Sequence, residues 1–132
     1  MPQHWSDTYV GLPYREDFNC AHLAARVRAE VFGQRVDLPV EIARGPLGRA
    51  QQIHTLRDAY AARTGSPVDG DGVLLCTRGR WQHIGLLCVI SGVQFVLHNV
   101  QGSSRCAGGV VRQRLSTLSN YGYAVEGFYK WK

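Results

Sequence analysis

The chemistry of this sequence centres on Cys20, which follows a polar turn and opens a stretch with helical spacing. A thiol in the first turn of a helix lies close to backbone N–H groups that have no partner within the helix, and to the positive end of the helix dipole. Both features favour the thiolate, which is the nucleophilic form of cysteine. A single cysteine is more often an inert core residue, so the interpretation of Cys20 as a nucleophile depends on the rest of the chain.

A cysteine nucleophile needs a base within hydrogen-bonding distance and a third group that orients the base. The chain has five histidines. His22 is two residues from Cys20, which corresponds to about 200° of helical rotation, so its ring would point away from the thiol. We interpret His4 and His54 as surface residues. The candidates that remain are His83 and His98.

His83 and His98 lie on consecutive segments with β-strand patterns, joined by a tight Ser91-Gly92 turn. Such segments pair antiparallel, so residues near the start of one lie beside residues near the end of the next. Pairing about the turn places His83 opposite Val100, with His98 two positions away on the same face of the sheet. We therefore expect the two imidazoles to be in contact, as a base and its orienting group would be.

The elements that position these residues follow from hydrophobic spacing. Helical spacing predicts a short helix within 5–10, a helix from Cys20 to Phe32 that ends at Gly33, and a second helix over 47–63. Beyond Val68 the pattern predicts strands at 73–77, 83–90, 93–100, 110–115 and 123–131. Helices followed by an antiparallel meander predict one α+β domain over residues 1–132, with N-terminal helices packed on one side of an antiparallel sheet of about five strands.

Composition and charge limit the classes of partner. A net charge of +5 favours an anionic partner, such as nucleic acid, an acidic lipid surface or a carboxylate-rich polymer. The arginines are scattered rather than clustered, so specific nucleic-acid binding is not expected. The apolar runs are too short to span a membrane. The first residues show no signal-peptide pattern, so we expect synthesis in the cytoplasm, with another component carrying the protein to any external site.

Other chemistries find less support in the residue spacing. A zinc site built from Cys20, His83 and His98 would use suitable ligands, but the chain has no local C-x-x-C or H-x-x-x-H pair. A serine nucleophile lacks a G-x-S-x-G context, and the glycines near 70 and 108 form no phosphate-binding loop. We therefore expect neither a metal nor a cofactor. The four cysteines lack disulfide-type spacing, and reduced thiols are the default expectation.

The order of these motifs resembles that of the NlpC-type papain-like cysteine peptidases of bacterial cell walls and phage tails. The family signature is a Gly-x-Pro-Tyr turn, an Asp-Cys pair at a helix start, a strand led by Gly-Asp, a His-Val-Gly strand and a polar residue on the next strand. The corresponding segments here are Gly11-Leu-Pro-Tyr14, Asn19-Cys20, Asp69-Gly-Asp-Gly-Val, His83-Ile-Gly and His98. This chain departs from the signature at Asn19, at His22 where glycine is common, and in its short 15–19 turn.

The resemblance implies a papain-like NlpC-type fold and a cysteine endopeptidase. It implies that Cys20 is the nucleophile, His83 the general base and His98 the group that orients His83. Tyr14 would join the Cys20 backbone N–H in stabilising the oxyanion. The implied substrate is the stem peptide of bacterial peptidoglycan. The implied partners are proteins of a phage tail or a contractile secretion device, and the implied site of action is the periplasm or cell wall.

Two alternatives remain open. Papain-like lipid acyltransferases and amidases carry their thiol in an Asn-Cys-x-His segment, which Asn19-Cys-Ala-His22 resembles, but their catalytic histidine precedes the cysteine in the chain. The second alternative is a tail or structural module that has the same fold without catalytic activity. Such a module would use its basic surface to bind the cell wall or a partner protein.

Overall fold

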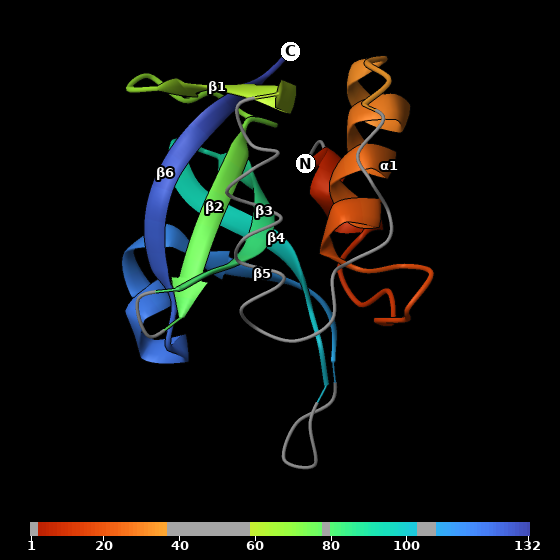
Figure 1. Cartoon of the computed structure of the whole chain (residues 1–132), viewed down its shortest axis with the longest axis vertical. Coiled ribbons are helices and arrows are strands. Elements are labelled where there is room, and N and C mark those ends of the chain that lie inside the picture. Colours follow the sequence, from red (N-terminus) through yellow and green to blue (C-terminus); the bar gives the residue numbers. More distant parts are fainter. Residues whose placement is uncertain (1–2, 37–58, 78–79, 103–107) are drawn as a thin grey trace.

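A computed structural model describes residues 3–36, 59–77, 80–102 and 108–132 (Figure 1). The described part is built around one antiparallel sheet of six strands, in the order β1-β6-β2-β3-β4-β5. The strands are β1 (Ala61–Thr64), β2 (Gly72–Thr77), β3 (Arg80–Ile90), β4 (Val93–Val100), β5 (Gly109–Arg114) and β6 (Ala124–Trp131). The helices are the α-helix α1 (Cys20–Phe32) and two 3-10 helices, η1 (Trp5–Thr8) and η2 (Leu115–Tyr121).

α1 begins at Cys20 because the residues around it cap its N-terminus. The Asn19 side chain accepts hydrogen bonds from the backbone N–H groups of Ala21 and His22, and the His22 ring accepts one from the Asn19 N–H. This reciprocal arrangement satisfies N–H groups that the helix itself cannot satisfy. At the other end, Gly33 stops the helix in the left-handed conformation, with a φ of 65°. The predicted bounds of this helix are confirmed.

The sheet has two faces with different coverings. Side chains in a strand alternate between faces because their period is two. On one side, which we call the helix face, β3 and β4 pack against α1; the cluster there includes Leu23, Val27, Leu86, Cys88 and Leu97. On the other side, which we call the η2 face, the central strands pack against η2; the cluster there includes Val73, Leu75, Leu87, Val96 and Leu118. The sheet therefore stands between α1 and η2 (Figure 1).

The predicted fold class is wrong. The described residues form a mainly-β fold with a six-stranded sheet, one α-helix and two short 3-10 helices. This overturns the expected α+β domain with N-terminal helices on a sheet of about five strands, and with it the expected papain-like NlpC-type fold class. Residues 59–60 of the helix predicted over 47–63 are helical, but its last residues belong instead to β1, in which Ala61 pairs with Trp131 of β6. Residues 47–58 of that prediction lie outside the described residues.

The β1 segment shows why the local spacing of apolar residues did not predict its secondary structure. A strand at the sheet edge is stabilised by its pairing with a partner that can be distant in sequence, and a local pattern does not reveal that partner. The short helix predicted within 5–10 is present as the four-residue η1. None of the described helices is both long and apolar enough to cross a membrane.

The other strand predictions are confirmed, with boundaries that differ by a few residues. The five predicted strands correspond to β2 through β6, and β3 starts earlier than expected, at Arg80. The β3–β4 turn consists of Ser91 and Gly92, which both have positive φ, 52° and 77°. A two-residue turn with positive φ at both positions matches the twist of the paired strands, so it fixes their register.

Candidate active site

His83 on β3 and His98 on β4 are in contact, as the strand pairing predicts. His83 Nε2 lies 2.9 Å from His98 Nδ1, and the ring centroids are 4.9 Å apart at an interplanar angle of 79°. The register pairs Gly85 with His98, so His83 lies diagonally across from His98 on the same face. The position of Gly85 has no room for a larger residue, because a Cβ there would lie 2.6 Å from Val96 Cγ1. Backbone pairing thus brings the two imidazoles together.

The second ring nitrogen of His98 contacts Gln113 on β5. His98 Nε2 lies 2.7 Å from Gln113 Oε1, and the His98 side chain is fully buried. Burial lowers the pKa of His98 because the protonated ring loses its solvation, while the hydrogen bond with Gln113 acts in the opposite direction. The environment therefore favours neutral His98, with both ring nitrogens engaged.

Tyr123, just after η2, covers the histidine pair. Its ring stacks on His83, with centroids 5.9 Å apart and an interplanar angle of 20°, and meets His98 edge-on at 5.1 Å. Tyr123 also packs against the cluster of the η2 face, and Leu75, the β2 residue paired with His83, belongs to that cluster. The histidine pair therefore lies on the η2 face.

Cys20 is the first residue of α1, and it is 7% exposed. The backbone just before it is tied to the sheet, because Asn99 Nδ2 on β4 donates a hydrogen bond of 2.7 Å to the Phe18 carbonyl oxygen. A residue at this position is near the positive end of the helix dipole, which favours a thiolate, whereas burial of the side chain acts in the opposite direction.

The sheet separates the two halves of the predicted site. Asn99 anchors the start of α1 and is the neighbour of His98 in β4, so Cys20 and the histidine pair lie at the same end of the β3–β4 hairpin. However, α1 packs on the helix face, whereas His83 and His98 project from the η2 face. Sequence reasoning paired the strands correctly but did not consider which face the helix covers.

The segment that leads to Tyr14 runs along the outer edge of β5. Gly11 N–H donates to the Val110 carbonyl at 2.9 Å, and Val110 N–H donates to the Leu12 carbonyl at 2.8 Å. Gly109 permits this close approach, because a Cβ there would lie 2.9 Å from the Leu12 oxygen. The segment is therefore fixed to the sheet on the side opposite β4.

Tyr14 itself is half-buried and is separated from Cys20 by a closed turn. The Arg15 N–H donates to the Phe18 carbonyl at 3.2 Å, and the Phe18 N–H donates to the Arg15 carbonyl at 3.0 Å. These two bonds hold the abbreviated turn that departs from the family signature. They connect the predicted oxyanion residue to the helix start through a short and ordered path.

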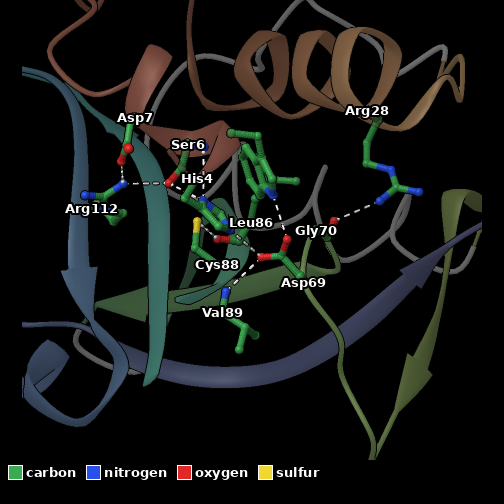
Figure 2. Close-up of polar contacts among 11 residues, drawn as sticks. His4, Ser6, Asp7, Arg28, Asp69, Gly70, Leu86, Cys88, Val89 and Arg112 are labelled. Atoms are coloured by element: carbon green, nitrogen blue, oxygen red, sulfur yellow. Dashed lines mark hydrogen bonds and ion pairs between the residues drawn. The ribbon is translucent and has the colours of Figure 1, made fainter. Parts of the chain in front are cut away.

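A second polar cluster lies between η1 and the helix face, around the carboxylate of Asp69 (Figure 2). Asp69 accepts hydrogen bonds from His4 Nε2 at 3.0 Å, Trp5 Nε1 at 2.7 Å and the Val89 N–H at 2.8 Å. His4 Nδ1 accepts from the Ser6 N–H at 3.1 Å, so the ring proton is on Nε2 and points at Asp69. The cluster therefore attaches η1 to the turn before β2 and to β3.

This cluster contains serine, histidine and aspartate, but its geometry is structural. Ser6 is fully buried, and its hydroxyl accepts a hydrogen bond from Arg112 at 2.7 Å. Cys88, next to it, is also fully buried, and burial raises the pKa of its thiol to about 12. A thiol with that pKa is protonated and inert at neutral pH. Of the cysteines in the described part of the chain, Cys20 is the one placed at a helix start.

Sequence reasoning missed Gln113 and Tyr123. His83, His98 and Gln113 are each separated by 15 residues and lie on three consecutive antiparallel strands. That equal spacing places them on a diagonal across one face, and it was the signal that could have identified Gln113. Tyr123 had no comparable signal, because its position depends on the path of the chain through η2.

The residues described here hold no metal-binding group: within 3–36, 59–77, 80–102 and 108–132, no three His, Cys, Asp or Glu side chains are placed to share a metal ion. In comparisons with known proteins, no family model, curated protein or solved structure matches this chain.

Proposed function

We propose that this chain is a cysteine endopeptidase that hydrolyses peptide bonds in bacterial peptidoglycan stem peptides, with the catalytic chemistry of the NlpC-type peptidases that its motifs resemble. The observation that carries the proposal is the hydrogen-bonded series His83, His98 and Gln113, at the end of the β3–β4 hairpin where Asn99 also anchors the start of α1. Thiol hydrolysis requires a base that is oriented by a second group and that can reach the thiol. Here the oriented base and the helix-start cysteine lie at the same end of the β3–β4 hairpin, on opposite faces of the sheet.

Each residue then has a role defined by its atoms. His83 Nε2 is occupied by His98, so the proposal assigns Nδ1 as the nitrogen that takes the proton from the Cys20 thiol. Because α1 packs on the helix face and His83 projects from the η2 face, the proposal requires the two groups to meet around the end of the β3–β4 hairpin. The thiolate attacks the peptide carbonyl and the amine leaves with a proton from the imidazolium. Water then hydrolyses the acyl-enzyme. Tyr14 and the Cys20 backbone N–H stabilise the oxyanion, and each such donor contributes about 2.7–4 kcal/mol.

The proposed substrate agrees with the charge of the chain. A net charge of +5 favours association with an anionic polymer, and bacterial cell wall is one. We further propose that the protein is synthesised in the cytoplasm and acts in the periplasm or cell wall as a component of a phage tail or as cargo of a contractile secretion device. Tail or secretion-apparatus proteins would then be its partners.

A second candidate is a binding module without catalytic activity. The observation that favours it is the placement of the histidine pair on the η2 face while α1 packs on the helix face. In that case the buried His98 and its partners would stabilise the sheet, and the basic surface would bind cell wall or a tail protein. The two candidates differ in one measurable property, the reactivity of Cys20.

Digestion of purified peptidoglycan tests the enzymatic proposal. Wild type should release peptide fragments that mass spectrometry can assign to one stem-peptide bond, and Cys20→Ala should release none. Cys76→Ala is a matched control, because Cys76 is a partly exposed thiol in β2 rather than at a helix start, and it should behave as wild type. Equal fragment release by wild type and Cys20→Ala would exclude the proposed mechanism, and release of fatty acids from lipid substrates would support an acyltransferase or amidase.

Alkylation with iodoacetamide at about pH 6 tests the thiolate directly. An activated Cys20 should be labelled at this pH, whereas an ordinary thiol with a pKa of about 8.5 reacts very slowly. Cys88 serves as an internal standard in the folded protein, since its buried thiol has a pKa of about 12 and should remain unlabelled. Labelling of Cys20 no faster than Cys76 would favour the binding module.

A further inference from the structure

Gln113 ends a chain of hydrogen bonds that crosses three strands. It lies on β5 opposite Val96, diagonal to His98, and its Oε1 is 2.7 Å from His98 Nε2. His98 Nδ1 in turn lies 2.9 Å from His83 Nε2. Each of the three residues projects from the η2 face, so the chain of hydrogen bonds follows a diagonal across that face.

The positions of the protons along this chain follow from the amide oxygen. A carbonyl oxygen only accepts hydrogen bonds, so His98 must carry its proton on Nε2. Burial favours neutral His98, and a neutral imidazole has one N–H, so His98 Nδ1 is an acceptor. The nitrogen that donates to it is His83 Nε2. Neutral His83 then has its lone pair on Nδ1.

The opposite orientation of the amide would reverse every proton. If the amide NH₂ of Gln113 faced His98, then His98 would carry its proton on Nδ1 and donate to His83 Nε2. His83 would then have its proton on Nδ1, where it could not accept a proton from a thiol. Along this chain of hydrogen bonds, the orientation of one side-chain amide, two hydrogen bonds away, favours either a base or a donor at His83 Nδ1.

We propose that Gln113 is a positioning residue that fixes, through His98, the tautomer of His83 in which Nδ1 is unprotonated. The inference rests on the proposed function for its catalytic consequence, because it assigns Nδ1 as the atom that takes the Cys20 proton. The tautomer itself is a property of the folded chain and does not depend on any activity. An imidazole in the wrong tautomer can lower the rate of a triad hydrolase by about four orders of magnitude.

The test is ¹⁵N NMR of histidine side chains in the full-length protein, which distinguishes Nδ1–H from Nε2–H tautomers. In the wild type, both His83 and His98 should be Nε2–H tautomers. Gln113→Glu should preserve them, because a carboxylate can only accept, whereas Gln113→Met, of similar length, should leave His83 as a mixture. A His83 Nδ1–H tautomer in wild type, or an unchanged spectrum in folded Gln113→Met, would overturn the proposal. If Gln113→Met fails to fold, the wild-type spectrum still decides.

Activity provides a separate measurement. On peptidoglycan fragments, Gln113→Met should lower kcat at least about tenfold, and Gln113→Glu should restore most of it. Loss of kcat in both variants with the tautomer preserved in Gln113→Glu would overturn the assigned role. If wild type shows no hydrolysis, the proposed function fails while the NMR result on the tautomer stands or falls independently.

Discussion

Asn99 holds Phe18: the amide nitrogen of this buried β4 residue lies 2.7 Å from the Phe18 carbonyl oxygen, two residues before Cys20. The other side-chain atom, Asn99 Oδ1, is buried and accepts no hydrogen bond from the part of the chain that the structure describes. One side-chain donor of β4 therefore ties the backbone just before α1 to the sheet.

Replacement of that donor should loosen the start of α1. Asn99→Leu removes a hydrogen bond that contributes about 0.5–1.5 kcal/mol, so amide exchange at Ala21 and His22 should accelerate about 2- to 10-fold. Hydrogen–deuterium exchange of the peptide that contains the helix start measures this change. Asn120→Leu, in the exposed part of η2, should leave it unaltered. Equal protection in wild type and Asn99→Leu would show that the anchor is dispensable.

Gly85→Ala should destabilise the β3–β4 pair. The new Cβ would lie 2.6 Å from Val96 Cγ1 and 3.2 Å from the Leu97 carbonyl oxygen, in a packed region that cannot easily expand. Such overpacking costs about 1–3 kcal/mol, measurable by urea unfolding. Gly65→Ala is the control, because its Cβ would meet nothing within 4 Å. A Gly85→Ala protein as stable as Gly65→Ala would contradict the tight packing around His98.

Stability should fall as the pH falls, in part because of His98. Its pKa is lowered in the folded protein, so the unfolded chain binds a proton first as the pH drops below about 6.5. The stabilisation is complete above that pH and is lost as the pH approaches the lower folded-state pKa. Urea unfolding of wild type at pH 7 and pH 5 measures the decline, and His98→Gln should reduce the difference between the two. An identical pH dependence in both proteins would argue that His98 accepts protons freely when folded.

Asp69→Asn should weaken the attachment of η1 to the sheet, which Arg112 of β5 also holds through its hydrogen bond to Ser6. The carboxylate accepts three hydrogen bonds, from His4, Trp5 and Val89, whereas an amide would present an NH₂ group to one of these donors. Leaving one such group unsatisfied costs about 1–3 kcal/mol, and the quenching of Trp5 fluorescence should change with it. Asp17→Asn alters an exposed carboxylate and should have neither effect. Unchanged stability in Asp69→Asn would mean that another contact holds η1.

The parts of the fold that were predictable are those governed by neighbouring residues. The bounds of α1 follow from Asn19 and Gly33, which cap its two ends, and the contact of His83 with His98 follows from the two-residue turn between their strands. Both depend on short-range geometry that a single sequence contains.

The predictions that were wrong concern features that depend on residues distant in the sequence. The strand β1 was not predicted, because its pairing with β6 is not visible in its own residues. The covering of one face by α1 and the other by η2 was also hidden, since a strand such as β3 has apolar residues on both faces and its pattern does not assign them. That ambiguity is why the thiol and the histidines could be named but not placed relative to the sheet.

The segment at Gly11 and Leu12 has a consequence for association between molecules. The Gly11 N–H donates to the Val110 carbonyl and the Val110 N–H donates to the Leu12 carbonyl, so the segment covers the start of the outer edge of β5, where unpaired N–H and C=O groups would otherwise recruit another strand. Removal of residues 1–13 would expose that edge. The N-terminal segment thus protects the sheet from edge-to-edge aggregation.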